Sequence, residues 1–116
     1  MSILDLSSLA TYIKVAILPP YMKNKYGLDL RYIVLKLLSK SPMHGYMLAS
    51  EILKQFGKKP SNGTLNPLFA RLEKEGLIDS YETIEHGKYK KIYSISAAGK
   101  EWLEKKTAHL KKFINY

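Results

Sequence analysis

The feature that most constrains the fold is a change in apolar spacing at Gly76. Upstream of it, apolar residues recur at i, i+3, i+4 and i+7, the spacing of one helix face: Leu65, Leu68, Phe69 and Leu72. Downstream, residues 77–85 and 89–95 are rich in Ile, Thr and Tyr, and the stretch 86–88, which contains a glycine, separates them. This composition predicts two strands and a turn. A helix must therefore be followed directly by a hairpin.

Four other segments have the spacing or boundary residues of helices: 5–18, 29–40, 45–56 and 97–115. Helix 5–18 is apolar around so much of its circumference that it must be covered on more than one side. The order helix, helix, helix, helix, hairpin, helix predicts a mainly α, small α+β fold. We expect a winged helix-turn-helix core over residues 29–95 with a further helix at each end. A length of 116 residues favours one domain, 1–116.

The charge of the chain indicates a polyanionic partner. The net charge is +9, carried almost entirely by lysine, and the pI is about 9.6. Nucleic acid is the first candidate and an anionic membrane the second. A lysine-rich composition bias with no functional meaning is the alternative.

Several functional classes are disfavoured by composition. The chain has no cysteine, and its three histidines lie far apart, so we expect neither disulfides nor a metal site. We find no catalytic constellation and no phosphate-binding glycine loop, so we expect no enzyme and no cofactor. No signal peptide and no 18-residue apolar span is evident, which predicts a cytoplasmic protein without membrane contact.

The start of the helix before Gly76 is polar and small. Turned away from its apolar stripe, it carries short residues, with the polar ones at the N-terminal end: Ser61, Asn62, Gly63, Thr64 and Asn66. A recognition helix enters the DNA major groove with such an end, where Asn can pair with adenine. An ordinary surface helix whose polar start only satisfies its own backbone is the alternative. Pro67 is tolerable if the first turn begins near Thr64.

Lysines lie on both sides of this helix in the sequence. Lys58 and Lys59 precede it, and Lys88, Lys90 and Lys91 follow it in the hairpin. They are expected near phosphates, which position a protein on DNA without reading sequence.

Three stretches resemble the PadR family of winged-helix transcriptional regulators: SPMHGYMLASEIL (41–53), PSNGTLNPLFARLEKEGLI (60–78) and GKYKKIYSISAAGKEWL (87–103). The resemblance covers about residues 29–103 and includes the His-Gly-Tyr entry to one helix and the Gly-Thr-Leu-x-Pro start of the next. It implies a homodimer that binds operator DNA and usually represses. The single C-terminal helix resembles the smaller subgroup of that family.

The resemblance also implies roles for individual residues. Tyr46 stands where the family has a tyrosine near the DNA backbone, the segment from Ser61 to Asn66 occupies the reading end of the recognition helix, and Lys88 and Lys90 occupy the wing. The terminal helices of two subunits would pack together, which predicts a dimer interface formed by apolar residues of both: Leu6, Leu9, Ile13, Ile17, Leu103, Leu110, Phe113 and Ile114.

Two residues depart from the family pattern. Asn66 replaces the usual tyrosine before the helix proline, so the target sequence cannot be carried over from relatives. Trp102 lies earlier than the tryptophan with which some members bind flat aromatic drugs, and it is expected to serve packing. An effector-binding sensor is a variant of the main interpretation; it would require a cavity lined by Tyr12, Trp102 or Phe113 at the dimer centre, and the effector is unknown. A winged helix used as a protein-interaction module and a non-specific architectural or RNA-binding protein are the alternatives to a specific regulator.

Overall fold

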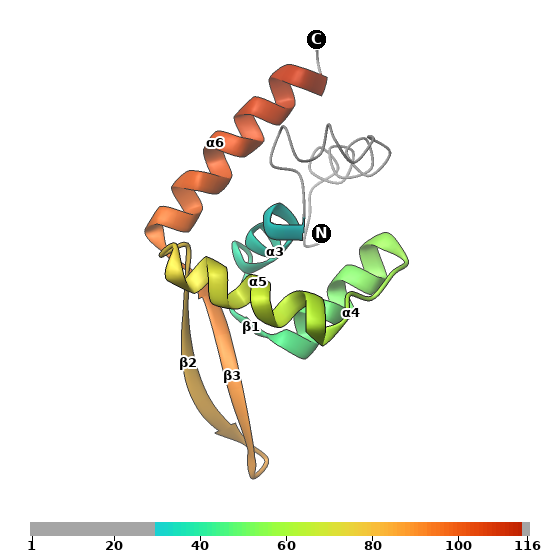
Figure 1. Ribbon diagram of the computed structural model, residues 1–116, viewed down its shortest axis with the longest axis vertical. Helices are drawn as coiled ribbons and strands as arrows, with labels where there is room; N and C mark the ends of the chain where they lie inside the picture. Colours follow the sequence, from blue (N-terminus) through green and yellow to red (C-terminus); the bar gives the residue numbers. More distant parts are fainter. Residues whose placement is uncertain (1–29, 115–116) are drawn as a thin grey trace.

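The computed structural model describes residues 30–114, except for the side chains of Phe56, Phe113 and Ile114. The predicted helix 5–18, with Leu6, Leu9, Ile13 and Ile17, lies outside the described residues. The described chain forms seven elements in this order: α3 (Leu30–Leu38), β1 (Met43–His44), α4 (Gly45–Phe56), α5 (Asn62–Lys74), β2 (Ile78–Glu85), β3 (Lys88–Ile95) and α6 (Ala97–Ile114). Figure 1 shows the hairpin β2–β3 and helix α6 extending in opposite directions from the helices between them.

The described part of the chain has the predicted winged helix-turn-helix fold. Helices α3, α4 and α5 are followed by an antiparallel hairpin, the wing, and then by α6. The sheet has a third strand that the sequence did not predict. Strand β1 is two residues long and pairs with β3, with Met43 opposite Tyr93 and His44 opposite Ile92, so the strand order is β1-β3-β2.

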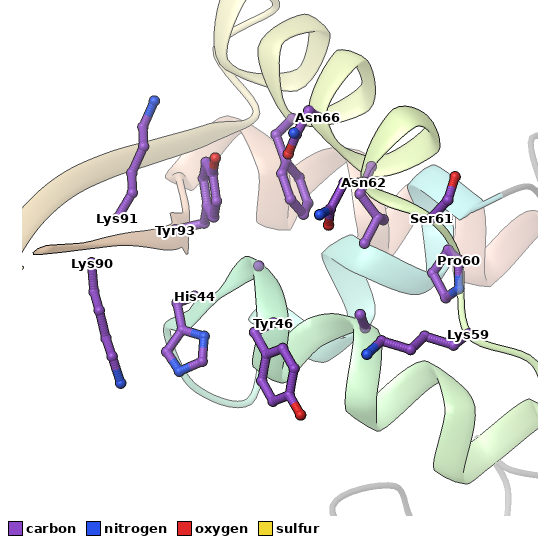
Figure 2. Close-up of a pocket in the computed structure, with 14 residues that line it drawn as sticks. His44, Tyr46, Lys59, Pro60, Ser61, Asn62, Asn66, Lys90, Lys91 and Tyr93 are labelled. Atoms are coloured by element: carbon purple, nitrogen blue, oxygen red, sulfur yellow. The ribbon is translucent and has the colours of Figure 1, made fainter. Parts of the chain in front are cut away.

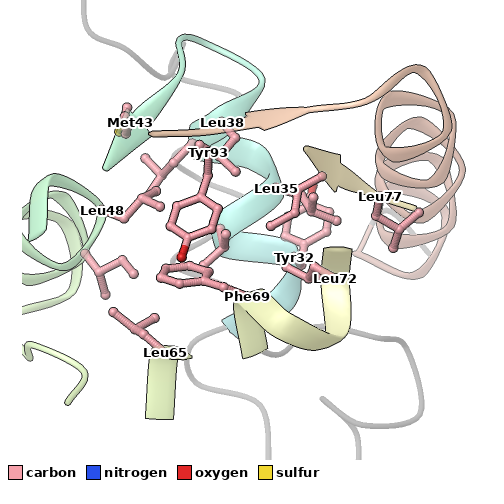
Figure 3. Close-up of a cluster of buried hydrophobic side chains, with 14 of the residues drawn as sticks. Tyr32, Leu35, Leu38, Met43, Leu48, Leu65, Phe69, Leu72, Leu77 and Tyr93 are labelled. Atoms are coloured by element: carbon pink, nitrogen blue, oxygen red, sulfur yellow. The ribbon is translucent and has the colours of Figure 1, made fainter. Parts of the chain in front are cut away.

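The core lies where the three helices meet the base of the sheet. It contains apolar side chains from every element (Figure 3): among others Tyr32, Leu35, Leu38, Met43, Leu48, Leu65, Phe69, Leu72, Leu77 and Tyr93. Phe69 of α5 and Tyr93 of β3 have ring centroids 4.3 Å apart, a distance that suits aromatic packing. The predicted inward face of the recognition helix is therefore confirmed, and it is fixed against the base of the wing.

Helix α4 has the predicted bounds, 45–56, because both ends carry local signals. His44 is its N-cap, and its Nδ1 accepts a hydrogen bond from the backbone N–H of Met47 at 3.2 Å. Gly57 ends the helix in the left-handed conformation, with φ of 74°, and donates its N–H to the carbonyl of Leu53.

Helix α5 begins earlier than predicted. Its first residue is Asn62 and its N-cap is Ser61, whose carbonyl accepts from the N–H groups of Thr64 and Leu65. Pro67 consequently falls in the second turn and not in the first. Because proline has no N–H, the carbonyl of Gly63 lacks its intrahelical donor. Gly63 is exposed, so water can satisfy that carbonyl.

The turn of the wing has two residues, not the predicted three. His86 and Gly87 both have positive φ, 52° and 75°, and Glu85 is paired with Lys88, so β3 begins at Lys88. Two consecutive residues with positive φ form the turn that best matches the twist of a two-residue hairpin. The tight turn extends the paired wing to the lysine that the sequence placed in the loop.

Helix α6 starts at Ala97, as predicted, and Ser96 caps it. Ser96 Oγ accepts from the N–H of Gly99 at 3.0 Å and donates to the carbonyl of Gly76 at 2.6 Å. A Cβ on Gly99 would lie 2.1 Å from the carbonyl oxygen of Leu77, so only glycine allows α6 to approach so closely.

Leu103 and Leu110, predicted in a dimer interface, are both buried in the core of this chain. Phe113 lies beyond them near the end of α6, followed by Ile114, the last residue of the helix.

Trp102 serves packing, as predicted. It is partly buried against the core, and cationic groups lie over its ring. The guanidinium of Arg31 is 5.1 Å from the ring centroid and the ammonium of Lys106 is 5.7 Å from it.

A hydrogen bond between Tyr32 and Thr107 connects α3 to α6. Thr107 donates its hydroxyl proton to the carbonyl of Leu103, so Tyr32 is the donor in the 2.8 Å bond between the hydroxyls of Tyr32 and Thr107. Burial raises the pKa of Tyr32.

Candidate nucleic-acid interface

An open hollow of about 840 Å³ lies between the start of α4, the start of α5 and strand β3 (Figure 2). Its lining combines polar, basic and apolar groups: His44, Gly45, Tyr46, Ala49, Lys59, Pro60, Ser61, Asn62, Leu65, Asn66, Phe69, Lys90, Lys91 and Tyr93. Three of these residues are lysines, and within this lining there is no aspartate or glutamate. The hollow therefore has the electrostatic character of a surface for an anionic partner.

The exposed start of α5 forms one wall. Asn62 and Asn66 are exposed and lie in the hollow, while Leu65 and Phe69 between them are buried beneath. Ser61 makes no side-chain cap to the helix backbone; its hydroxyl lies 3.1 Å from that of Thr64. The polar start is thus not consumed by capping its own helix, which was the alternative reading of this segment. Its amides remain available for another molecule.

Tyr46 and two basic side chains form the opposite wall. Tyr46 is 70% exposed, and the ammonium of Lys59 lies 4.7 Å from its ring centroid. The ring of His44 stacks beside Tyr46 with centroids 6.3 Å apart. Because Nδ1 of His44 accepts the capping hydrogen bond from Met47, the proton of the neutral ring is on Nε2. Three donors of different shape thus lie together: a phenol, an ammonium and an imidazole N–H.

The wing contributes lysines that differ in their partners. Lys90 pairs with Glu85 at 3.3 Å, and Lys91 pairs with Glu73 at 3.4 Å. Lys88, next to the turn, is exposed and forms no salt bridge in the described part of the chain. The wing therefore carries two paired cations beside the hollow and one unpaired cation near its tip.

Two tyrosines of the wing have shifted pKa values for different reasons. Burial raises the pKa of Tyr93, whose ring packs on Phe69. Tyr89 is exposed, and its hydroxyl donates to Glu82 at 3.0 Å; this hydrogen bond and the negative charge of Glu82 raise the pKa of Tyr89.

The structure brings together six of the ten residues predicted to contact DNA: Tyr46, Lys59, Ser61, Asn62, Asn66 and Lys90. Four others are exposed but do not line the hollow: Lys58, Gly63, Thr64 and Lys88. The assignment of all ten as DNA contacts stays a prediction.

The predicted set of ten contacts leaves out His44, Lys91 and Tyr93, although all three line the hollow and Lys91 was expected near phosphates. His44 caps the backbone of α4 and also lines the hollow. Lys91 was recognised as a hairpin lysine, but the strand register that brings it to the hollow is not visible in the sequence. Nothing in the pattern distinguishes Tyr93 from a packing residue.

Among the described residues, two further features are absent: a cluster of metal ligands and a membrane-spanning helix. Within residues 30–114, no group of three potential ligands among His, Asp and Glu is placed to hold a metal ion. In the same range, no helix has the length and apolarity that a membrane span requires.

The three helices, the wing and the basic hollow between them define the class of winged-helix regulators. Residues 34–105 match the transcriptional regulator PadR-like family, which is more than half of the chain. The protein belongs to the PadR-like family of transcriptional regulators, and this family is not one of enzymes.

Individual relatives agree with this assignment. The chain is 37% identical over 78 residues to transcriptional regulator YqjI of Escherichia coli, which covers 66% of this chain and 36% of YqjI. It spans about a third of that relative. A PadR-like transcription factor from Bacteroides fragilis superimposes with a TM-score of 0.70 at 25% identity, covering 82% of this chain and 91% of that one. The structure of Bacillus subtilis PadR in complex with operator DNA superimposes with a TM-score of 0.59 at 32% identity, covering 66% and 45%.

Proposed function

We propose that this protein is a sequence-specific DNA-binding repressor that acts as a homodimer on a palindromic operator. The observation that carries the proposal is the hollow itself, in which the uncharged amides of Asn62 and Asn66 lie between lysines and no carboxylate belongs to the lining. Amides can read base edges and ammonium groups can contact phosphates, so the hollow offers both parts of DNA recognition.

The binding mode follows from the placement of these groups. The start of α5 enters the major groove, where Asn62 and Asn66 meet base edges. Tyr46 and Lys59 contact the backbone on one side, and the unpaired Lys88 of the wing contacts it on the other. Bacillus subtilis PadR, which is similar to this chain over 66% of its length, was solved with operator DNA. That similarity supports duplex DNA as the ligand.

The dimer rests on different support. The resemblance to the family and the broad apolar surface predicted for residues 5–18 favour it. The large apolar side chains described along α6 do not add to this support, since Leu103 and Leu110 are already buried in their own chain. Two recognition helices of a dimer would enter successive major grooves about 34 Å apart, and the bound dimer would block a promoter.

The test is selection of bound duplexes from a randomised pool, followed by sequencing. A specific homodimer selects two inverted half-sites whose centres lie about one helical turn apart. Sedimentation of the complex must then show two chains on each selected duplex, and transcription from a promoter that carries the site must fall when protein is added.

The same experiment separates the alternatives. An architectural or RNA-binding protein enriches no motif from the pool, although it retains DNA at low salt. A protein-interaction module retains no duplex at any salt concentration. A single, unrepeated half-site bound by one chain would contradict the homodimer while leaving specific DNA binding intact.

A further inference from the structure

Two of the three lysines that line the hollow are paired with carboxylates that lie outside its lining. The ammonium of Lys91 is 3.4 Å from Oε1 of Glu73, and that of Lys90 is 3.3 Å from Oε2 of Glu85. Lys59, the third, has the ring of Tyr46 as its neighbour and no carboxylate among the described residues. The acidic residues of this surface are therefore placed where they restrain the wing lysines.

Glu73 is the better fixed of the two carboxylates. It lies on α5, and its second oxygen, Oε2, accepts a hydrogen bond from the hydroxyl of Ser80 at 3.0 Å. One carboxylate thus connects the recognition helix to both strands of the wing, to β2 through Ser80 and to β3 through Lys91. The ammonium of Lys91 also lies 5.6 Å from the ring centroid of Tyr93, so its position has more than one determinant.

Non-specific binding to DNA depends almost entirely on contacts between cations and phosphates, whereas specific binding adds contacts with bases. A lysine held by a carboxylate contributes less to the phosphate contacts. If the lysine is released, it can contact phosphates wherever the protein binds along the DNA. This includes positions at which α5 makes no specific contact with bases.

We infer that Glu73 is a specificity-determining residue, because it withholds Lys91 from DNA phosphates and fixes the wing to the recognition helix. Glu85 has the same effect on Lys90 at the more exposed end of the wing. The inference rests on the proposed function, since it concerns the balance between reading and non-specific attraction on the same surface. It gives a role to Glu73 and Glu85, two acidic residues that lie beside a basic DNA-binding surface.

Glu73→Gln tests the inference, because glutamine keeps the volume and an acceptor for Ser80 but removes the charge. Binding to a shuffled duplex is measured by fluorescence anisotropy between 50 mM and 200 mM salt. We expect tighter binding of the shuffled duplex and a slope of log K against log salt that is steeper by about 0.9 for each subunit in contact. The preference for the selected site over the shuffled one falls.

A double variant separates charge release from a structural effect. Lys91→Ala alone leaves the salt slope nearly unchanged, since Lys91 is withheld in the native protein. In the Glu73→Gln background, Lys91→Ala removes the added slope. A variant in which the wing is merely loosened binds both duplexes more weakly and shows no steeper slope, which would contradict the inference.

Two matched controls remove the same charge elsewhere. Glu101→Gln breaks the exposed pair of Glu101 with Lys105 on α6, whose atoms are 3.2 Å apart. Asp79→Asn changes a wing residue that has no ion pair in the described part of the chain and lies beside Ser80 on the other face of β2. Neither control should steepen the salt slope as Glu73→Gln does.

The outcomes distinguish this inference from the proposed function. If the native protein prefers its selected site but Glu73→Gln changes neither the slope nor the affinity for shuffled DNA, the inference is wrong and the proposed function stands. If the native protein shows no salt-dependent duplex binding, the proposed function itself fails. If Glu73→Gln does not fold, Glu85→Gln decides the question by the same slope, and an unchanged slope there overturns the inference.

Discussion

The start of helix α5 and the wing face the same hollow but are built in opposite ways. The start of α5 carries short, uncharged polar groups above fully buried side chains, with Leu65 only 1% exposed. The wing carries charged groups in pairs, and near its tip even apolar side chains are exposed, such as Ile84 at 67% and Tyr89 at 71%. A rigid surface suits reading of bases, whereas a charged and less anchored one suits contact with a uniform backbone.

The difference follows from the support beneath each region. Helix α5 places three of its residues in the core: Leu65, Phe69 and Leu72. The wing is a two-stranded hairpin, which is marginally stable in isolation. Its base is held by the buried residues Ile78, Ile92 and Tyr93, and beyond them the strands have polar or exposed residues on both faces. Stability is therefore concentrated where the proposed reading takes place.

The largest expected effect concerns the support of α5. Leu65→Ala should lower the free energy of unfolding by about 2–5 kcal/mol, because it leaves a cavity in a fully packed core. Urea denaturation followed by circular dichroism measures the loss. Leu53→Ala is the matched control, since Leu53 lies on α4 and is 44% exposed; it should cost less than about 1 kcal/mol. Equal losses in the two variants would show that α5 is no better supported than the surface.

The next effect concerns the reading groups. Asn62→Ala and Asn66→Ala should each cost about 1–3 kcal/mol of binding to the selected site, if each amide pairs with a base. Binding to a shuffled duplex should change little, because no phosphate contact is removed. Anisotropy titrations on both duplexes give the comparison. An equal loss on both duplexes would show that the amides contact the backbone and that the reading face has been assigned wrongly.

A smaller effect is expected from the unpaired lysine of the wing. Lys88→Ala should weaken binding to every duplex alike and reduce the salt slope by about 0.9 for each subunit, the contribution of one phosphate. Lys105→Ala on α6 is the control, because Lys105 is paired with Glu101. A change in preference between selected and shuffled DNA in Lys88→Ala would mean that the wing also reads sequence.

The smallest effect concerns pairing within the wing. The hydrogen bond from Tyr89 to Glu82 and the charge of Glu82 raise the pKa of Tyr89. Glu82→Gln should therefore lower that pKa toward the ordinary value of 10.0 for tyrosine, so that phenolate forms at lower pH. NMR titration of the tyrosine ring signals measures the shift, with Glu101→Gln as the control. An unchanged titration would mean that the two groups do not pair in solution.

The sequence predicted those parts of the fold that have local causes. The bounds of α4 follow from its cap at His44 and its stop at Gly57, and the start of α6 follows from Ser96. The family resemblance and the order of elements together predicted the winged helix. Six of the predicted DNA-contacting residues line one hollow. Most of them are neighbours in the chain, so their proximity also has a local cause.

The remainder depends on contacts between distant residues. Strand β1 exists because Met43 and His44 pair with residues about fifty positions later in the chain, a pairing that no local pattern shows. His86 has a positive φ, which is unusual for a residue other than glycine. The sequence therefore did not indicate a two-residue turn, and the turn was predicted one residue too long. The pairing of Lys91 with Glu73 joins a strand to a helix and depends on the packing of both.

The central claim is that the start of α5 reads sequence and that lysines provide attraction without reading. The measurement that tests it most directly is anisotropy of the native protein on its selected duplex and on a shuffled duplex of equal length, at 50 mM and 200 mM salt. We predict that affinity falls with salt on both duplexes and that a clear preference for the selected duplex persists at 200 mM. Equal affinity for the two duplexes, lost together as salt is raised, would contradict the claim.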